Sequence, residues 1–262
     1  MSNYQTITYE ETEQVALIRL NMPEMRNPLS MEMCKELVQA IRFADDKEDI
    51  RSILLTGTGK AFSAGADIRG FQGNLTKSAP QLYEEGIEST GLFKLGSTVK
   101  TPIIAAVNGA AFGGGAGLVA MSHLAVASDK AKIGLTELKL GIVPFVIMPL
   151  VRRAVGNRKL LEMMLTANTY TALEAKDLQL VHKVVPHDQL EEEAWKLAKQ
   201  VASYSPLAVR LSLEAFYLTE QVDLPKSMDL LSMMRIVSFQ SEDLKEGAMA
   251  FIEKRSPVWT GR

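Results

Sequence analysis

The first candidate for chemistry in this chain is a set of backbone amides in the glycine-dense turn Gly113-Gly114-Gly115. An apolar run, Thr101 to Val107, precedes the turn and small helix-forming residues follow it, which predicts a strand, a tight loop and a helix start. Glycine allows the backbone to approach a ligand, and the first amides of a helix lack intrahelical acceptors. Such amides can bind a phosphate or the oxyanion of a polarised carbonyl. The turn lacks the spacing of a dinucleotide-binding loop and the Lys-Ser/Thr of a P-loop.

A glycine cluster alone is also compatible with close packing, so a second element is needed. The segment Ala64-Gly65-Ala66 supplies one, because it again places small residues after a strand-like run, Ile50 to Thr56. Two such loops could offer two backbone N–H groups to one oxygen. On these paired loops and their spacing, the chain resembles the crotonase superfamily, the enoyl-CoA hydratase and isomerase family, nearly from end to end.

The resemblance implies chemistry on an acyl-CoA thioester that passes through an enolate-like species. The amides of Ala66 and Gly114 would form the oxyanion hole for the thioester oxygen, a contribution typically worth a few kcal/mol for each donor. Coenzyme A would be part of the substrate, and no other cofactor is implied. The further residues that the resemblance assigns to binding of the substrate and its CoA are Met25, Arg26, Ala64, Asp67, Ile68, Gly113, Phe145 and Lys254, with Arg255 beside the last.

The side-chain acid/base is predicted to be Glu137. Crotonase hydratases place two glutamates around the substrate, but the first of these positions is Gly117 here, and only the second carries a carboxylate. Apolar neighbours such as Leu135 and Leu138 would desolvate an inward-facing carboxylate and raise its pKa toward a range useful for proton transfer. The alternative is a solvated carboxylate at the start of a helix.

A single glutamate leaves the reaction open. Hydration leads because it is the frequent activity in the family, whereas a lone glutamate resembles the isomerases that move a double bond from carbons three and four to carbons two and three. A non-catalytic acyl-CoA binder, a thioesterase and a decarboxylase are further alternatives. A replacement acid could come from residues that are otherwise expected to be structural or solvated, namely Glu84, Glu85, Glu88 and His123.

Composition excludes several other classes. The 262 residues carry a net charge of −2, which gives no electrostatic case for nucleic acid or an anionic membrane. Cys34 is the only cysteine, and the three histidines lack ligand spacing, so no metal site is expected. We expect a cytoplasmic protein, because the sequence shows neither a signal segment nor a membrane-length apolar run.

The elements that would position these groups follow from recurring strand, turn and helix patterns. They predict an α/β fold, which the resemblance specifies as a crotonase-like spiral of stacked ββα units over residues 1–200. Ser30 should cap a helix of about 15 residues with Phe43 on its inner face, and the polar segment near 71–80 could cover the site. Residues 201–262 are expected to form a helical trimerisation region, since the helix near 225–238 is apolar on several sides. The resemblance implies a homotrimer or a homohexamer.

Overall fold

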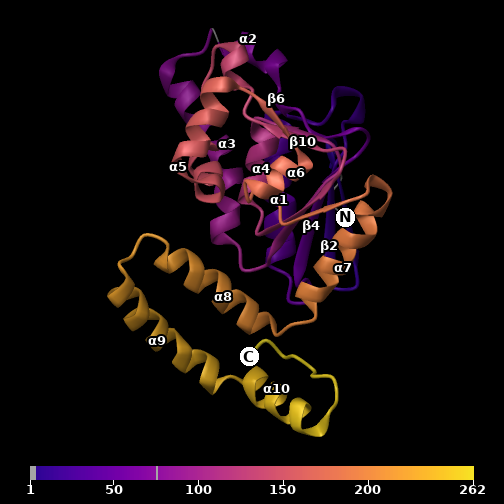
Figure 1. Cartoon of the computed structure of the whole chain (residues 1–262), viewed down its shortest axis with the longest axis vertical. Coiled ribbons are helices and arrows are strands. Elements are labelled where there is room, and N and C mark those ends of the chain that lie inside the picture. Colours follow the sequence, from indigo (N-terminus) through magenta and orange to yellow (C-terminus); the bar gives the residue numbers. More distant parts are fainter. Residues whose placement is uncertain (1–3, 75) are drawn as a thin grey trace.

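The computed structural model describes residues 4–74 and 76–262, and within them a large sheet forms the centre of the molecule (Figure 1). Its strands are parallel except for the antiparallel hairpin of the first two. Continuous apolar runs such as Ser52–Gly57 are buried along their whole length, as expected when helices cover both faces of a parallel sheet. The strands in spatial order are β1 (Ile7–Thr12), β2 (Val15–Leu20), β4 (Ser52–Gly57), β7 (Ile103–Val107), β9 (Leu124–Ser128) and β12 (Lys183–Val185).

Two smaller sheets lie after the ends of these strands. The first contains, in order, β11 (Thr169–Thr171), β10 (Lys132–Gly134), β8 (Ala110–Phe112) and β5 (Ala61–Ser63), and the second pairs β3 (Pro28–Leu29) with β6 (Gly65–Ala66). The chain therefore passes repeatedly from a strand of the large sheet, to a strand of a small sheet, to a helix. This repetition confirms the α/β fold with stacked ββα units.

The helices lie between and after these strands. They are α1 (Met31–Asp45), α2 (Phe71–Asn74), α3 (Ala79–Thr98), α4 (Gly114–Met121), α5 (Met148–Thr166), α6 (Ala172–Asp177), α7 (Leu190–Ala202), α8 (Pro206–Thr219), α9 (Leu224–Gln240) and α10 (Glu242–Glu253). Short 3-10 turns lie at Pro23–Met25, Ile68–Gly70, Glu137–Leu140 and His187–Gln189. Helix α5 has a non-helical backbone at Gly156, where φ is +76°.

Alternation along the central strands separates two apolar clusters. Val15, Leu17 and Leu54 face α7, whereas their neighbours Ala16 and Ile18 face the cluster that includes α1. Because successive side chains of a strand point to opposite faces, each strand contributes to both clusters. The large sheet thus provides a rigid layer from which the loops of the candidate site extend.

Helix α1 begins at its predicted cap, because Ser30 Oγ accepts a hydrogen bond from the Met33 amide at 3.2 Å. The prediction that Phe43 lies on the inner face is wrong: its side chain is 47% exposed and packs edge-on against Tyr9. Its neighbours in the helix, Ile41 and Ala44, are fully buried. Phe43 therefore lies just outside the apolar stripe of the helix and faces solvent.

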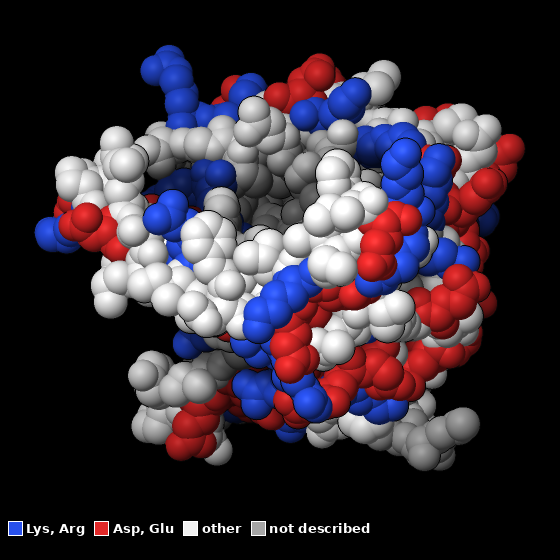
Figure 2. All heavy atoms as spheres, turned by 90° about the horizontal axis from the view of Figure 1, so that it is seen from below, with Lys and Arg blue, Asp and Glu red and all other residues white. Residues whose placement is uncertain are grey.

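Helices α8, α9 and α10 extend away from the sheet layer (Figure 1). Large apolar side chains of α9 are exposed in the single chain, among them Met228, Met233 and Ile236 at 60% or more. Figure 2 views this end of the molecule, where acidic and basic side chains are interspersed around a hollow with mainly uncharged walls. Among the described residues, no helix combines the length and the apolarity needed to cross a bilayer.

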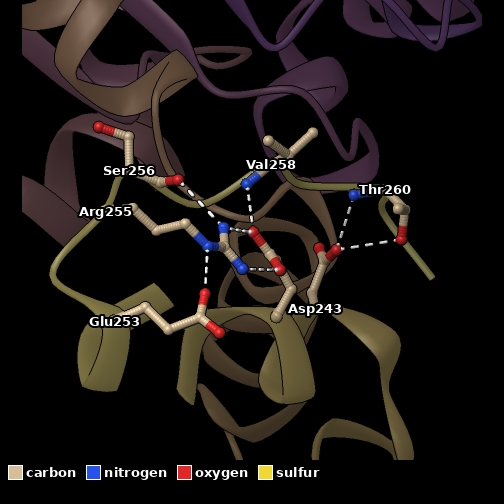
Figure 3. A network of polar contacts seen from close by, with 7 residues as sticks. Asp243, Glu253, Arg255, Ser256, Val258 and Thr260 are labelled. Carbon is tan, nitrogen blue, oxygen red and sulfur yellow. Dashed lines mark hydrogen bonds and ion pairs between the residues drawn. The ribbon is translucent and has the colours of Figure 1, made fainter. Parts of the chain in front are cut away.

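A polar network fastens the C-terminal segment to α10 (Figure 3). Arg255 contacts Glu246 and Glu253, and the carboxylate of Glu246 also accepts a hydrogen bond from the Val258 amide at 2.7 Å. The buried Asp243 accepts hydrogen bonds from the Thr260 amide and from the Ser205 hydroxyl. These contacts tie the C-terminal segment to α10, and α10 to the start of α8.

Candidate active site

A pocket of about 670 Å³ lies where the β3–β6 pair, α1, α3 and the segment before α5 meet. Of the residues predicted from the sequence, Ala66, Asp67, Gly114, Glu137 and Phe145 line it. The other lining residues form an apolar majority with a few polar groups: Leu29, Ser30, Met31, Glu32, Cys34, Gly70, Asn74, Lys77, Leu82, Glu85, Gly86, Ser89, Phe93, Ile142, Val143, Pro144, Val146 and Ile147. Such a lining is typical of a small-molecule site.

The two glycine-containing loops approach each other at one end of this pocket. A β-carbon added to Gly65 would lie 3.4 Å from the Gly114 amide nitrogen, and one added to Gly114 would lie 3.9 Å from the Ala66 amide nitrogen. Gly114 is the first residue of α4, so its amide precedes the intrahelical acceptors. Both amides belong to residues that line the pocket. The amides of Ala66 and Gly114 therefore lie close to each other at one end of the pocket.

Glycine is required at this meeting point for steric reasons. Gly65 has a φ of +92°, and an added β-carbon would lie 2.6 Å from the carbonyl oxygen of Phe112. A side chain there would force β6 away from β8, and with it the Ala66 amide away from the glycine turn. The close approach of the loops thus depends on a residue that the sequence pattern marked only as small.

The loop that contains Ala66 is held by the buried Asn27, which sequence reasoning did not single out. Its side-chain amide donates to the carbonyls of Thr58, Ala61 and Phe62 at 2.9–3.2 Å, and its oxygen accepts from the Met22 amide at 2.8 Å. The Asn27 backbone has a φ of 53°, a region that asparagine tolerates better than most residues. The sequence signal that could have pointed to Asn27 is its position beside a proline in a loop.

Ser63 continues this support toward the site. Its buried hydroxyl donates to the Asn27 carbonyl at 2.8 Å and accepts from the Gly65 amide at 3.2 Å. Asn27 and Ser63 together connect the turn before β3 to the turn before β6. They fix the backbone immediately preceding Ala66.

The Glu137 carboxylate lies at the glycine turn. A β-carbon added to Gly113 would come within 2.9 Å of Glu137 Oε1, while Oε2 is buried and has no hydrogen-bond partner among the described residues. Burial raises the pKa of this carboxyl above its ordinary value. These surroundings differ from those of a solvated helix-start carboxylate.

The position of the missing glutamate is closed. A β-carbon added to Gly117 would lie 2.3 Å from Ile147 Cγ2 and 2.8 Å from Phe93 Cε1. Both of these side chains are buried, and both line the pocket. The absence of a second carboxylate at this position is therefore matched by apolar side chains that occupy its space.

The other acids weighed as replacements have different surroundings. Glu85 lines the pocket but pairs with Lys77 at 2.7 Å, and Glu88 pairs with Lys35 at 3.3 Å. His123 lines a separate pocket; its Nδ1 accepts from the Ile103 amide at 2.8 Å, and burial lowers its pKa to about 4. Lys77 belongs to the polar segment that was expected to cover the site. Its ion pair with Glu85 was not predicted.

That segment contains one turn of helix, α2, before α3 begins at Ala79, and residue 75 lies outside the described residues. Asn74 and Lys77 line the pocket, so part of the segment borders the site as expected.

Several predicted CoA-binding residues lie beside the pocket rather than in its lining. The Ala64 amide donates to the Arg26 carbonyl at 2.8 Å, which brings Met25 and Arg26 next to the second loop. Ile68 follows Asp67 and is 54% exposed, while Asp67 pairs with Arg69, whose side-chain hydrogen bonds lower the pKa of that carboxyl.

Lys254 and Arg255 are not brought to this pocket within one chain. Lys254 caps the end of α10, far from α2 and α3 (Figure 1). Arg255 is engaged by Glu246 and Glu253, which raise the pKa of its guanidinium (Figure 3). A contact of either residue with bound CoA would require a neighbouring subunit.

Comparison with known proteins identifies the family. The model of the family described as "Enoyl-CoA hydratase/isomerase" matches residues 10–262. The chain belongs to the enoyl-CoA hydratase/isomerase family.

Individual members of this family match over nearly the whole chain. A "Probable enoyl-CoA hydratase, mitochondrial" from Dictyostelium discoideum is 38% identical over 97% of this chain and 90% of the relative. A "Putative enoyl-CoA hydratase" from Thermus thermophilus is 38% identical over 94% of this chain and 98% of the relative. The crystal structure of an enoyl-CoA hydratase from Bacillus anthracis superimposes with a TM-score of 0.92 at 33% identity, covering 98% of this chain and all of the other.

Proposed function

We propose that this family member converts an enoyl-CoA thioester through an enolate-like intermediate, with Glu137 as its only side-chain acid/base. The observation that carries the proposal is the meeting, in one pocket, of the Ala66 and Gly114 loops with a buried carboxylate. Backbone amides directed at the thioester oxygen would stabilise the charge that develops there. A carboxyl whose pKa is raised by burial binds a transferred proton more strongly than an ordinary glutamate does, which suits a general base.

Hydration is the leading reaction, because the similar family members above carry the name enoyl-CoA hydratase. Glu137 would take a proton from the water molecule as its oxygen bonds to carbon three, and would then deliver that proton to carbon two. The chemistry uses no cofactor besides the CoA of the substrate. The CoA part of the substrate would be bound by residues of the Ala66 loop and the turn beside it: Met25, Arg26, Ala64, Asp67 and Ile68.

Isomerisation is the second candidate, and the closed space at Gly117 favours it. One carboxylate can remove a proton from carbon two and return it to carbon four without an activated water. Phe93 and Ile147 leave no room for a second acid at position 117. The enzyme would then convert a 3-enoyl-CoA into a 2-enoyl-CoA.

Product mass separates these reactions. Crotonyl-CoA that gains one water supports hydration, and 3-hexenoyl-CoA that becomes conjugated at unchanged mass supports isomerisation. Release of free CoA thiol or of carbon dioxide would indicate a thioesterase or a decarboxylase. Binding of crotonyl-CoA without any turnover would support the non-catalytic alternative and contradict the proposal.

We also propose that α8 and α9 form the contact between subunits of a homotrimer, or of a hexamer built from two trimers. The exposed apolar side chains of α9 support this, since so large an apolar surface is rare on a soluble single chain. Light scattering of the purified protein would measure the subunit number. A monodisperse monomer would contradict the proposal.

A further inference from the structure

Two apolar side chains fill the space that any side chain at position 117 would need. Phe93 lies in α3, and Ile147 is the N-cap residue of α5. We call this pair of side chains the wall. Phe93 is 8% exposed and Ile147 is 3% exposed, and both belong to the main apolar cluster of the chain. Close packing on both sides holds the two side chains in place.

The wall reaches the glycine turn next to the candidate oxyanion donor. A β-carbon added to Gly114 would lie 3.8 Å from Phe93 Cζ, and the same ring closes the space at Gly117. Glu137 meets the turn at Gly113 instead. The wall and the carboxylate therefore border the same short turn, and both line the same pocket.

Unlike Glu137, the side chains of Phe93 and Ile147 cannot bind a water molecule through hydrogen bonds. Neither phenylalanine nor isoleucine has a hydrogen-bond donor or acceptor, so water placed against the wall would lose hydrogen bonds. The face of the pocket that these two side chains form therefore offers a water molecule no side-chain hydrogen bond.

The inability of the wall to bind water matters for the proposed function, because only one of the two candidate reactions consumes a water molecule. Hydration forms a bond between a water oxygen and carbon three, and carbon two gains a proton as the double bond is lost. The double-bond shift only removes a proton from carbon two and adds one to carbon four. The first reaction consumes a water and the second does not, although both pass through charge on the same thioester oxygen.

We propose that Phe93 and Ile147 determine the balance between these reactions, by excluding water from the face of the acyl group that they border. This role rests on the proposed function and adds to it a pair of specificity-determining residues that touch no reacting proton. Opening the wall should admit water and raise hydration relative to isomerisation.

The test compares two substrates of the same chain length, so that a change in pocket size affects both. For the full chain we would measure kcat/KM for hydration of 2-hexenoyl-CoA and for isomerisation of 3-hexenoyl-CoA. Phe93→Leu, Phe93→Ala and Ile147→Ala should each raise the ratio of hydration to isomerisation, on the order of fivefold, the factor that one additional hydrogen bond to water typically provides. Leu160→Ala in α5 is the control, because Leu160 is buried and outside the pocket lining; its ratio should stay at the wild-type value.

The outcomes separate the two proposals. A wild-type protein that converts neither compound overturns the proposed function and the role of the wall with it. An active wild type whose ratio is unchanged in folded Phe93→Leu and Ile147→Ala, or that hydrates without measurable isomerisation, overturns the role of the wall alone. Thermal unfolding identifies a variant that does not fold, and Phe93→Leu keeps the test decisive because it retains most of the buried volume.

Discussion

Replacing Gly117 by alanine should force a measurable repacking between α4 and α5. The added β-carbon would lie 2.3 Å from Ile147 Cγ2, well inside an ordinary contact, so the isoleucine side chain or its helix must move. Overpacking of this kind typically costs about 1–3 kcal/mol, and the helix propensity of alanine returns about 1 kcal/mol. The net effect should be a destabilisation of about 1 kcal/mol.

A double-mutant cycle with Ile147→Ala isolates the clash. Ile147→Ala alone leaves a cavity, but in the double variant the new methyl group occupies part of that space. The propensity gain is the same in both backgrounds and cancels. We expect the double variant to be more stable than the sum of the single changes by about 1–2 kcal/mol.

Urea unfolding at fixed protein concentration would measure the four free energies of unfolding. Gly91→Ala in α3 is the control, because a β-carbon there meets no atom within 4 Å and only the propensity gain remains. A coupling smaller than about 0.3 kcal/mol would refute the close contact between Gly117 and Ile147, since such additivity is typical of independent sites.

Four further predictions concern the candidate site. Because burial raises the pKa of Glu137, the kcat/KM of turnover should fall as pH is lowered through a value above the ordinary range of a glutamate, and a profile flat down to pH 4.5 would contradict this. By the same shift, raising the pH through that pKa should destabilise the wild type but not Glu137→Gln, as measured by the pH dependence of unfolding. Gly113→Ala, at a φ of +51° and 2.9 Å from Glu137 Oε1, should lower kcat about 10²-fold in a folded protein; undiminished turnover would argue against the site. Asn27→Ala should lower the free energy of unfolding by about 3 kcal/mol, because it leaves several buried backbone groups unpaired, and a loss under about 1 kcal/mol would show that water replaces the side chain.

Local signals accounted for most of the fold. Helices α1, α8 and α10 begin where a serine caps the first turn, and each of these caps is visible in the sequence beside an apolar periodic segment. The burial of Phe43 was predicted wrongly because periodicity gives the direction of an apolar stripe but not its width. The largely apolar segment Leu180 to Val185 predicts a strand, but only Lys183–Val185 pairs with β9.

The backbone part of the site was predictable and the side-chain part was less so. Two glycine-containing loops after buried strands, read with the family resemblance, predicted that Ala66 and Gly114 lie together, and both line one pocket. Phe93 and Ile147 gave no such signal, because an apolar residue in α3 or before α5 looks like any other core residue. Their proximity to Gly117 arises from packing between helices that are far apart in sequence.

The assignment of Glu137 as the only acid/base is tested most directly by the kcat of Glu137→Gln on an enoyl-CoA that the wild type converts. The amide keeps the size of the side chain but cannot accept and return the proton, so kcat should fall by about 10²–10⁴-fold while the dissociation constant for the thioester changes little. Turnover within a few-fold of the wild type would contradict the account.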